Sequence, residues 1–575
     1  MMDLNQFELK WSDPCHKIGL MTSAYPSSFS PSDGNAGGRK GNSKVILVVI
    51  LLLVAAGAYV FGKDGSNGAA PWDDERSIDY SKPLKIVAAT ELSDMEPFIK
   101  QASADLGFDI QMDYDSGTLV NTRNLLDGAY SDKYDATWFA TDAFAKVQGP
   151  NPQTIHYTIA RSPIALGIKK DVMDRLGWHH KEVKWADIAD AAARGDLTFG
   201  MTDPQESNSG FLTLLSVFAE FGHFPKNEPF DISKASINEP RLKDFFSGQT
   251  ITSGSSGWLR DTFLKNPDKA DGIFNYQSVL ESMKENDGAD IDVIIPGEAT
   301  GVADYPLSPL RRDGDQDAER DSQAKVRALS SWFDEHRAEV EEKTHLDAEP
   351  VYARNEEAES YYQYPETQGD IDFLNRLYHD VLRRPADSNF LLDTSGSMRG
   401  KRLKDLKAIL TSLINDTAGE KDNPKGFSRR ETIKFMPFSS KVAEGYTQEH
   451  FDPASAEQKR GLQDYVNGLQ PRGETAIYDA VLQAYEQADK NGDLLSSIVL
   501  MTDGASNAGT NRKDFINRLD RKLATTKRKI PVFVILYGES SEEEMNFLAD
   551  YTGGKVFDAR SGDMAKAFEE IRSYQ

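Results

Sequence analysis

Five residues of this 575-residue chain have side chains well suited to bind a ligand. They provide two carboxylates and three hydroxyls and are spread over three loops. Asp393, Ser395 and Ser397 occupy alternate positions just after the apolar pair Leu391-Leu392. Alternate residues of an extended loop point to the same side, so these three oxygens can converge on one point. Hard oxygen ligands of this kind suit Mg²⁺. We therefore predict a metal site at this loop.

Two further loops supply the remaining oxygens. Thr475 lies in a turn before the helix-like run 477–488, and Asp503 ends the apolar run 497–502. Loops at the carboxyl ends of parallel strands meet at one edge of a sheet and build sites there. The alternative is that 393–397 is only a polar turn with a helix N-cap. That alternative explains any one loop, but it does not explain three loops in this order.

The pattern Asp-x-Ser-x-Ser, a distant Thr and a strand-terminal Asp-Gly resembles the metal-ion-dependent adhesion site of von Willebrand factor type A (VWA) domains, at all five positions. The resemblance implies a site for Mg²⁺ or Mn²⁺. It implies hydroxyl ligands from Ser395, Ser397 and Thr475, while Asp393 and Asp503 hold waters and balance charge. An open coordination position would then accept an acidic side chain from a protein partner.

Hydrophobic periodicity around these loops predicts a doubly wound, Rossmann-like α/β domain over 386–575. Apolar residues recur at three- and four-residue spacing from Leu403 to Ile414, which indicates an amphipathic helix. A closing helix is expected over 563–574, with Met564, Ala567, Phe568 and Ile571 buried. Strands alternating with helices indicate parallel pairing. The expected strands are Thr432 to Phe438, Ile498 to Thr502 and Val532 to Tyr537.

A run of seventeen uncharged residues, 45–61, is long enough for a single membrane crossing, and we predict a transmembrane helix over 45–62. Arg39, Lys40 and Lys44 precede it, and acidic residues follow it. The positive-inside bias then places a disordered tail, 1–44, in the cytoplasm and the bulk of the chain outside the cell membrane. A linker is expected over 63–83.

A cleaved signal peptide is the competing interpretation of this run, with Ala56-Gly57-Ala58 as the cleavage site. A 44-residue leader is long for a signal peptide, and the apolar run continues past these small residues to Phe61. We therefore favour an uncleaved, single-pass anchor with the amino terminus in the cytoplasm.

Composition limits the kinds of partner. Sixty-six basic and 91 acidic residues leave a formal net charge of −25, which disfavours nucleic acid and anionic lipid surfaces. Cys15 is the only cysteine, so no intramolecular disulfide can form. Walker, Gly-x-Gly-x-x-Gly and Gly-x-Ser-x-Gly motifs are absent from the sequence, and we expect a binding protein rather than an enzyme.

The middle of the chain carries a second α/β pattern. Strand-like runs such as 85–89 and 134–139 lead into hydroxyl-rich turns before helices, and helix N-termini of this kind favour anions. This series, with Ser162 to Ile168 and Thr202 to Phe211, resembles the type II periplasmic solute-binding protein fold over 84–345. The resemblance implies two lobes with a ligand between them. We expect crossovers near 161–168 and 292–301, and a connector over 346–385.

Seven residues are candidates to line that ligand cleft, and all are polar but uncharged. Each one alone is as well explained as an N-cap or turn residue, and a tyrosine is more often part of the core. As a set, they predict a small polar or anionic solute. The candidates are Thr90, Ser93, Ser116, Ser162, Ser207, Ser209 and Tyr276.

These features together predict a bacterial surface receptor. The middle domain would capture a solute, and the VWA domain would bind a protein through its metal. Two alternatives remain open from the sequence. The chain could be the solute receptor of a membrane transport system, with the VWA domain as a docking module, or it could be a pure adhesin whose middle domain has lost its ligand.

Overall fold

The computed structural model describes residues 78–575, except 115, 298, 348–360, 416–425, 489–493, 527–528, 539–540, 561–566, 569–570 and 573–575. The predicted tail, transmembrane helix and most of the linker, 1–77, lie outside the described residues. Over the part of the chain that is described, no helix is both long and apolar enough to cross a membrane.

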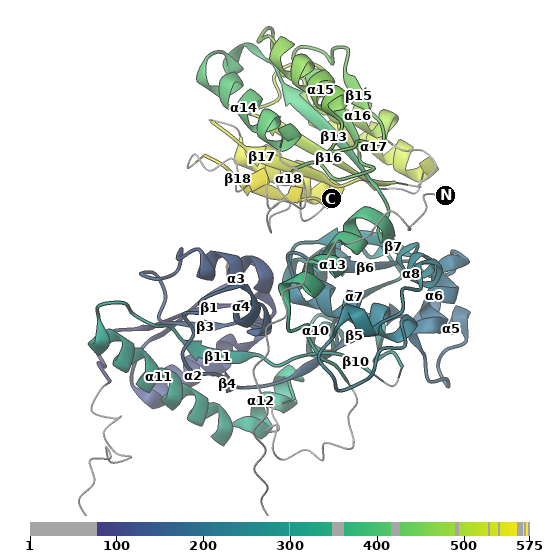
Figure 1. The fold of residues 1–575 in the computed structure, drawn as a ribbon. Helices are drawn as coiled ribbons and strands as arrows, with labels where there is room; N and C mark the ends of the chain where they lie inside the picture. The colour runs from purple at the N-terminus through teal and green to yellow at the C-terminus, as the bar shows by residue number, and fades with distance from the viewer. Residues whose placement is uncertain are drawn as a thin grey trace, which may run out of the picture. The chain divides into compact units, whose positions relative to one another are not determined.

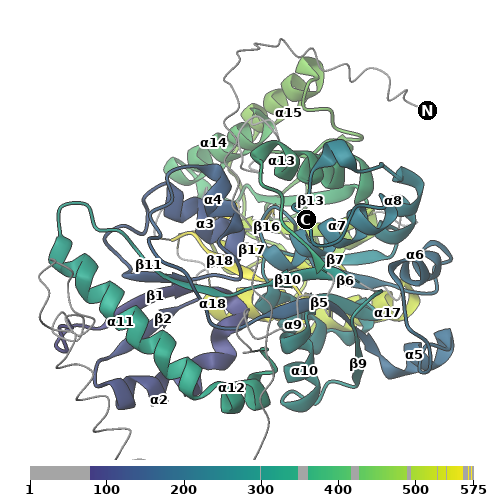
Figure 2. The ribbon, with the colours of Figure 1, turned by 60° about the horizontal axis from the view of Figure 1, so that its bottom comes forward.

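The first lobe is built on a five-stranded sheet with the order β2-β1-β3-β11-β4 (Figure 1). Strand β1 alternates its side chains between two cores. Ile86 packs with α2 and α11, and Val87 packs with Leu125 of α3 on the opposite face. Figure 2 shows α11 and α2 on the first of these faces. The strands are β1 (Leu84–Ala88), β2 (Ile110–Asp113), β3 (Ala136–Trp138), β4 (Tyr157–Thr158) and β11 (Pro306–Pro309). The helices are α2 (Glu96–Leu106), α3 (Thr118–Leu126), α4 (Ala143–Gln148), α11 (Gln316–Glu335) and α12 (Arg337–Thr344).

The second lobe is built on a sheet with the order β12-β10-β5-β8-β6-β7, with β9 also paired to β5. Its long central strand, β5 (Ser162–Lys169), is apolar and almost wholly buried, as a strand covered on both faces must be. The other strands are β6 (Phe199–Thr202), β7 (Gln249–Ser253), β8 (Gly272–Tyr276), β9 (Ile291–Ile294), β10 (Thr300–Ala303) and β12 (Tyr361–Tyr362). The helices are α5 (Lys170–Leu176), α6 (Trp185–Ala193), α7 (Asn208–Phe221), α8 (Glu239–Phe246), α9 (Ser256–Lys265) and α10 (Gln277–Glu285).

The chain passes between the two lobes twice. The first crossing joins β4, which ends at Thr158, to β5, which begins at Ser162, close to the predicted position. The return differs from the prediction near 292–301. Strands β9 and β10 both pair with β5, so the chain stays in the second lobe until Ala303. The return is made at Asp304 and Tyr305, whose N–H groups both donate to the Ala140 carbonyl.

The described part of the predicted connector packs against the second lobe instead of simply linking two domains. Strand β12 pairs with β10, and helix α13 (Gln368–Leu377) continues into one π-helical turn (Tyr378–Leu382). Leu374 and Tyr378 are fully buried in the same core as the lobe. The Tyr378 hydroxyl donates to the Gln249 side-chain carbonyl over 3.2 Å.

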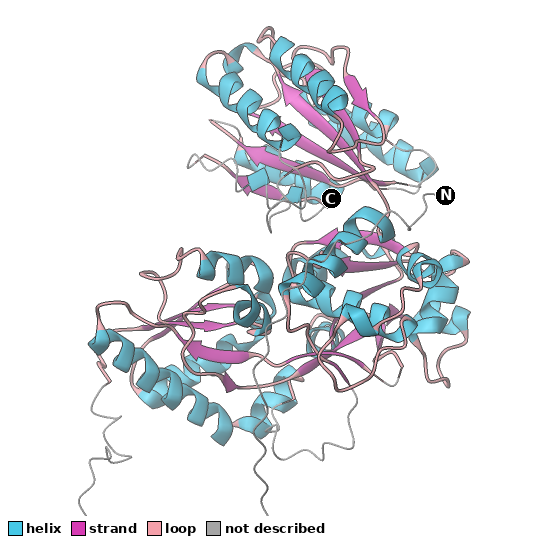
Figure 3. Ribbon diagram, viewed as in Figure 1, coloured by secondary structure: helices cyan, strands magenta, loops and turns pink. Residues whose placement is uncertain are grey.

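Residues from 386 onward form a doubly wound domain, as predicted (Figure 3). Its sheet has the order β15-β14-β13-β16-β17-β18 and is parallel except for the edge strand β15. One face packs on α14 and α15, the other on α16, α17 and α18. The strands are β13 (Ala386–Asp393), β14 (Thr432–Phe438), β15 (Tyr446–Gln448), β16 (Leu495–Thr502), β17 (Val532–Leu536) and β18 (Val556–Asp558). The helices are α14 (Lys401–Asn415), α15 (Ala456–Gly468), α16 (Ile477–Gln487), α17 (Arg512–Thr526) and α18 (Glu542–Thr552).

The predicted closing helix is described at only a few positions. Ala567, Phe568 and Ile571 are buried in the core of the domain, as expected. Met564, the fourth residue predicted to be buried, lies outside the described residues.

Candidate metal site and ligand cleft

The loops predicted to bind metal meet at one edge of the β13–β18 sheet. Strands β13 and β16 are parallel neighbours, with Leu392 opposite Met501. Asp393 is the last residue of β13, and Asp503 directly follows β16. Their carboxylates therefore emerge side by side, as the topology of an open parallel sheet requires.

A continuous hydrogen-bond network joins four of the five predicted ligands. The Ser395 and Ser397 hydroxyl oxygens are 2.8 Å apart, and the Ser397 hydroxyl donates to the Asp503 carboxylate over 2.8 Å. The Ser395 N–H donates to one Asp393 oxygen over 2.7 Å, and the Thr502 hydroxyl donates to the other over 2.7 Å. The network holds both carboxylates and both serines in one place.

Thr475, the fifth predicted ligand, lies in the second loop, and backbone contacts hold this loop against the first one. The Gly396 N–H donates to the Gly473 carbonyl over 2.9 Å. Gly473 has φ of 75°, and a Cβ there would lie 2.7 Å from the Ser440 hydroxyl, so this turn needs glycine. The Thr475 hydroxyl lies 4.0 Å from the position that a Cβ would take on Gly504, next to Asp503.

Burial sets the electrostatics of this site. Asp393 and Asp503 are 0% and 2% exposed, whereas Ser397 is exposed and leaves one side of the group open to solvent. Burial raises the pKa of Asp393, because a desolvated carboxylate is unstable without a cation nearby. The second carboxylate, Asp503, forms an ion pair with the Arg402 guanidinium of α14.

The five residues fit a divalent cation. They offer two carboxylates and three hydroxyls at one point, and the burial of Asp393 favours a positive charge beside it. Across the described ranges, no group of three or more His, Cys, Asp or Glu side chains is placed to hold a metal. A site here would therefore depend on hydroxyl oxygens, which is the chemistry that the sequence predicts.

The seven cleft candidates separate into different environments. Ser207 and Ser209 lie together at the start of α7, where a chain of hydroxyl contacts links Thr202, Ser209 and Ser256 over 2.8 Å each. Ser162 is buried, and its hydroxyl accepts from the Ser278 N–H over 3.1 Å. Each of these hydroxyls therefore has at least one hydrogen-bond partner within the protein.

Thr90 and Tyr276 lie closer to the centre between the lobes. The Thr90 hydroxyl accepts from the Gly257 N–H of the other lobe over 3.4 Å. The Tyr276 hydroxyl accepts from the Asn208 amide over 3.0 Å. Ser93 is exposed and Ser116 partly buried, and for the described part of the chain no hydrogen bond joins either side chain to the other candidates.

Four residues at this centre are missing from the predicted set: Glu91, Asn208, Asp304 and Tyr305. The Tyr305 hydroxyl is 3.5 Å from the Glu91 carboxylate. A charged residue in the turn after strand β1, and the Asp-Tyr-Pro sequence at the return crossing, were the available signals for three of them. The selection of uncharged residues excluded Glu91 and Asp304.

Two arginines bridge the lobes on either side of this centre. Arg123 of the first lobe donates to the Glu206 carboxylate over 2.9 Å and to the Gln205 carbonyl over 2.7 Å. Arg260 of the second lobe binds both oxygens of Asp94 over 3.0 and 3.1 Å. A cavity of only about 10 Å³ borders Glu91 and Tyr305, so the lobes are closed on each other.

Comparison with known proteins finds a family match for the last third of the chain. Residues 389–571 match the von Willebrand factor type A domain family. Human inter-alpha-trypsin inhibitor heavy chain H3 is 24% identical over 163 residues, and human heavy chain H4 is 27% identical over 143 residues. These matches cover 27% and 24% of this chain, but only 17% and 14% of the two heavy chains. The chain thus spans less than a fifth of the length of these curated relatives.

Solved structures are similar to each half of the chain. The periplasmic binding protein AfuA from Actinobacillus pleuropneumoniae, with fructose-6-phosphate bound, covers 52% of this chain and 99% of its own, at 12% identity and a TM-score of 0.41. A von Willebrand factor type A protein from Catenulispora acidiphila covers 34% of this chain and 43% of its own, at 16% identity and a TM-score of 0.26. Residues 389–571, which match the von Willebrand factor type A domain family, coincide with the doubly wound domain, and a two-lobed α/β region precedes them in this chain.

Proposed function

We propose that this protein is a receptor with two binding sites, a metal-dependent site for a protein partner in the VWA domain and a solute site between the two lobes. The observation that carries the proposal is the meeting of Asp393, Ser395, Ser397, Thr475 and Asp503 at one sheet edge. Both folds are binding modules, so no catalytic step is part of the proposal.

In this proposal, Ser395, Ser397 and Thr475 provide hydroxyl oxygens for Mg²⁺ or Mn²⁺, and the two aspartates balance its charge. When bound, the metal supplies an electrophilic centre that accepts an acidic side chain from the partner. The exposure of Ser397 supports this role, because a partner needs access from solvent. The hydrogen bonds of Asp393 with Ser395 and Thr502 hold that carboxylate in position.

The solute site is supported by the position of its residues. Thr90 and Glu91 follow β1, Tyr276 ends β8, and Asp304 and Tyr305 make the return crossing. Ligands of open α/β sheets bind outside the carboxyl ends of strands. Two lobes joined by two crossings can close on a ligand as a hinge, with the crossings as its axis.

The proposal also includes the cellular location expected from the sequence. Residues 45–62 would anchor the chain in a bacterial cell membrane, and both binding sites would face outside the cytoplasm. Protease protection in intact cells and in inverted membrane vesicles would test this. Cleavage of the VWA domain only in the inverted vesicles would contradict the orientation.

A metal titration tests the VWA site. We expect Mg²⁺ or Mn²⁺ to raise the melting temperature of the purified protein, since a ligand at 100 times its Kd stabilises by about 2.7 kcal/mol. Asp393→Ala should abolish the shift. Asp464→Asn, which removes an exposed carboxylate on α15, is the matched control and should keep it. Equal metal shifts in wild type and Asp393→Ala would reject the site.

Partner binding is tested separately, by pull-down from cell envelopes with and without EDTA. We expect proteins that are retained by the wild type in Mg²⁺, released by EDTA and not retained by Asp393→Ala. Retention that is the same for both proteins and insensitive to EDTA would reject metal-dependent binding.

A further inference from the structure

Two carboxylates at the centre of the cleft have no basic side chain bound to them. The Glu91 oxygens contact neutral groups, namely the Tyr305 hydroxyl at 3.5 Å, the Thr90 hydroxyl at 3.4 Å and the Glu91 backbone N–H. One Asp304 oxygen is buried and has no hydrogen-bond partner. Within the described residues, neither carboxylate forms an ion pair. Both are partly buried, so their negative charges are poorly compensated.

Several basic side chains in this region are already bound to other carboxylates. Lys146 and His156 each lie 2.7 Å from Asp142. Arg123 and Arg260 are paired with Glu206 and Asp94. An anionic ligand would therefore meet the Glu91 and Asp304 carboxylates, while these four basic groups are already paired.

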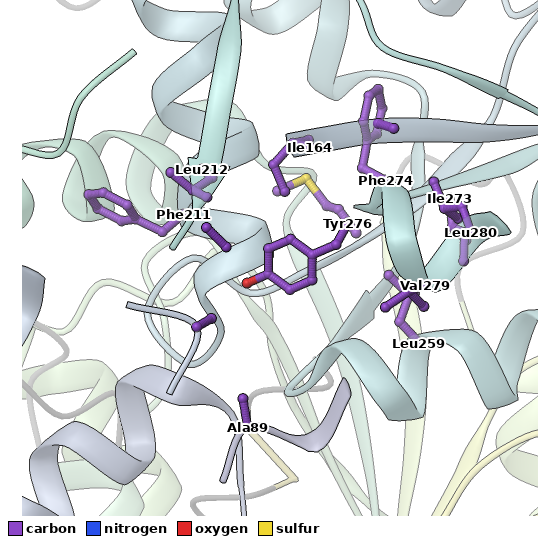
Figure 4. Packing of buried hydrophobic residues seen from close by; sticks show 14 of the residues in the cluster. Ala89, Ile164, Phe211, Leu212, Leu259, Ile273, Phe274, Tyr276, Val279 and Leu280 are labelled. Carbon is purple, nitrogen blue, oxygen red and sulfur yellow. The ribbon is translucent and has the colours of Figure 1, made fainter. Parts of the chain in front are cut away.

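Three tyrosines lie near one or both of these carboxylates. Tyr276 and Tyr305 are both 0% exposed, with ring centroids 5.8 Å apart and an interplanar angle of 69°. The Tyr364 hydroxyl donates to the Asn208 side-chain carbonyl over 2.8 Å, and the Asn208 amide donates in turn to the Tyr276 hydroxyl. In Figure 4, the Tyr276 hydroxyl points away from Phe274 and Val279, on the side of Phe211.

Carboxylates beside aromatic rings favour cationic ligands. A desolvated carboxylate is stabilised by a cation, and the face of a tyrosine ring attracts an ammonium group. Burial already raises the pKa of Glu91 to about 7 and that of Asp304 to about 6, so each group binds a proton readily when no other cation is present. A bound cation would take the place of those protons.

We infer that the cleft binds a small organic cation, whose ammonium or amine groups pair with the Glu91 and Asp304 carboxylates near the rings of Tyr276 and Tyr305. The inference rests on the proposed capture of a solute in this cleft and names the chemical class of that solute. It replaces the anionic solute expected from hydroxyl-rich turns, because the hydroxyls of Ser162 and Ser209 are already paired within the protein.

Ligands of equal length and different charge test the inference with the full-length protein. The cationic probes are putrescine, choline and agmatine. The matched controls for putrescine are 1,4-butanediol, which is neutral, and succinate, which is anionic. We expect one or more of the cations to raise the melting temperature at millimolar concentration and to give a binding isotherm by calorimetry, while butanediol and succinate do neither.

Substitutions then localise the binding. Glu91→Gln and Asp304→Asn keep the side-chain shape and remove the charge, and each should weaken binding of the cation about tenfold or more. Neither variant should unfold the protein, since each removes a poorly compensated charge. Asp132→Asn, at an exposed position of the first lobe, is the matched control and should bind like wild type.

The possible outcomes separate the two proposals. Binding of succinate or butanediol without binding of any cation would overturn the cation inference but keep solute capture. Absence of binding by ligands of all three charges would overturn solute capture itself. Cation binding that is equal in wild type, Glu91→Gln and Asp304→Asn would place the ligand elsewhere and overturn the assigned site.

Discussion

Arg402 of α14 and Asp503 at the end of β16 form an ion pair at the edge of the candidate metal site. Arg402 is one-third exposed, and Asp503 is fully buried. The guanidinium thus provides a positive charge to one of the two carboxylates that a metal would also use. This places a permanent cation in direct competition with a divalent one.

Replacing Arg402 should therefore increase metal affinity. We expect Arg402→Gln to bind Mg²⁺ roughly threefold to tenfold more tightly, because removing a like charge a few ångströms away is worth about 1 kcal/mol. Mg²⁺ titration followed by melting temperature measures this change. Lys401→Gln is the control, since Lys401 pairs with Asp405 instead. Weaker metal binding by Arg402→Gln would show that the arginine orients Asp503 rather than competing for it.

Stability of the protein without ligand should fall as the pH rises from about 4 to 7. The pKa of Glu91 is raised from 4.5 to about 7 and that of Asp304 from 3.8 to about 6 by burial. At pH values between the unfolded-state pKa and the folded-state pKa of each group, the native state holds more protons than the unfolded state. The free energy of unfolding therefore decreases as the pH rises.

Other groups face these two carboxylates. Those facing Glu91 are Thr90, Tyr276 and Tyr305, and those facing Asp304 are Thr141, Asp142, Lys146 and Tyr364.

Urea unfolding at several pH values measures this dependence. Glu91→Gln should show a smaller loss of stability between pH 4 and 7, because its amide does not titrate. A saturating cation should restore stability at and above pH 7, where the carboxylates are charged. The same slope in wild type and Glu91→Gln would contradict the assignment of the effect to this residue.

The two arginine bridges should control how far the lobes separate. Removing both, with Arg123→Ala and Arg260→Ala, removes about 2 kcal/mol of closing interaction if each pair contributes about 1 kcal/mol. Such a change shifts the closed-to-open equilibrium about thirtyfold. We expect a larger radius of gyration by small-angle X-ray scattering. Arg241→Ala, whose ion pairs with Asp190 and Asp244 stay within the second lobe, should leave the radius unchanged.

The buried pair of Glu431 and Arg572 should be a major determinant of VWA-domain stability. Two parallel hydrogen bonds of 2.8 and 2.7 Å join them, and their side chains are 0% and 3% exposed. Glu431→Ala removes the carboxylate that balances a buried guanidinium, so we expect a loss of about 3–5 kcal/mol in chemical denaturation. Ser388→Ala removes only one hydrogen bond to Glu431 and should cost about 1 kcal/mol. Equal losses would contradict this ranking.

The VWA domain was predictable in detail because its signals are local. Strand β14 has the predicted bounds, Thr432 to Phe438, and β17 is one residue shorter than predicted. Each is a short apolar run bounded by turn residues, so the pattern is contained in a few consecutive positions. The metal motif is similarly compact, with three of its five residues in 393–397.

The middle of the chain was predictable only in outline. Its hydroxyl-rich turns indicated a ligand cleft, but the return crossing is at Asp304 and Tyr305 and not at 292–301. Tyr364 was placed in a connector, yet its hydroxyl binds Asn208, 156 residues earlier in the chain. Pairing across such distances depends on which strand of the sheet receives the returning chain, and hydrophobic periodicity does not contain that information.

The sequence by itself determined the doubly wound domain, the alternation of strands and helices in the middle of the chain and the oxygen ligands of the metal motif, because each depends on neighbouring residues. Only the tertiary structure decided the charge of the cleft. Glu91, Asp304 and the three tyrosines come from separate segments, and each has an ordinary surface or core role when read alone. Their proximity, and the pairing of nearby arginines and lysines with other carboxylates, arise from long-range packing. These two features make a cation the ligand favoured by this cleft.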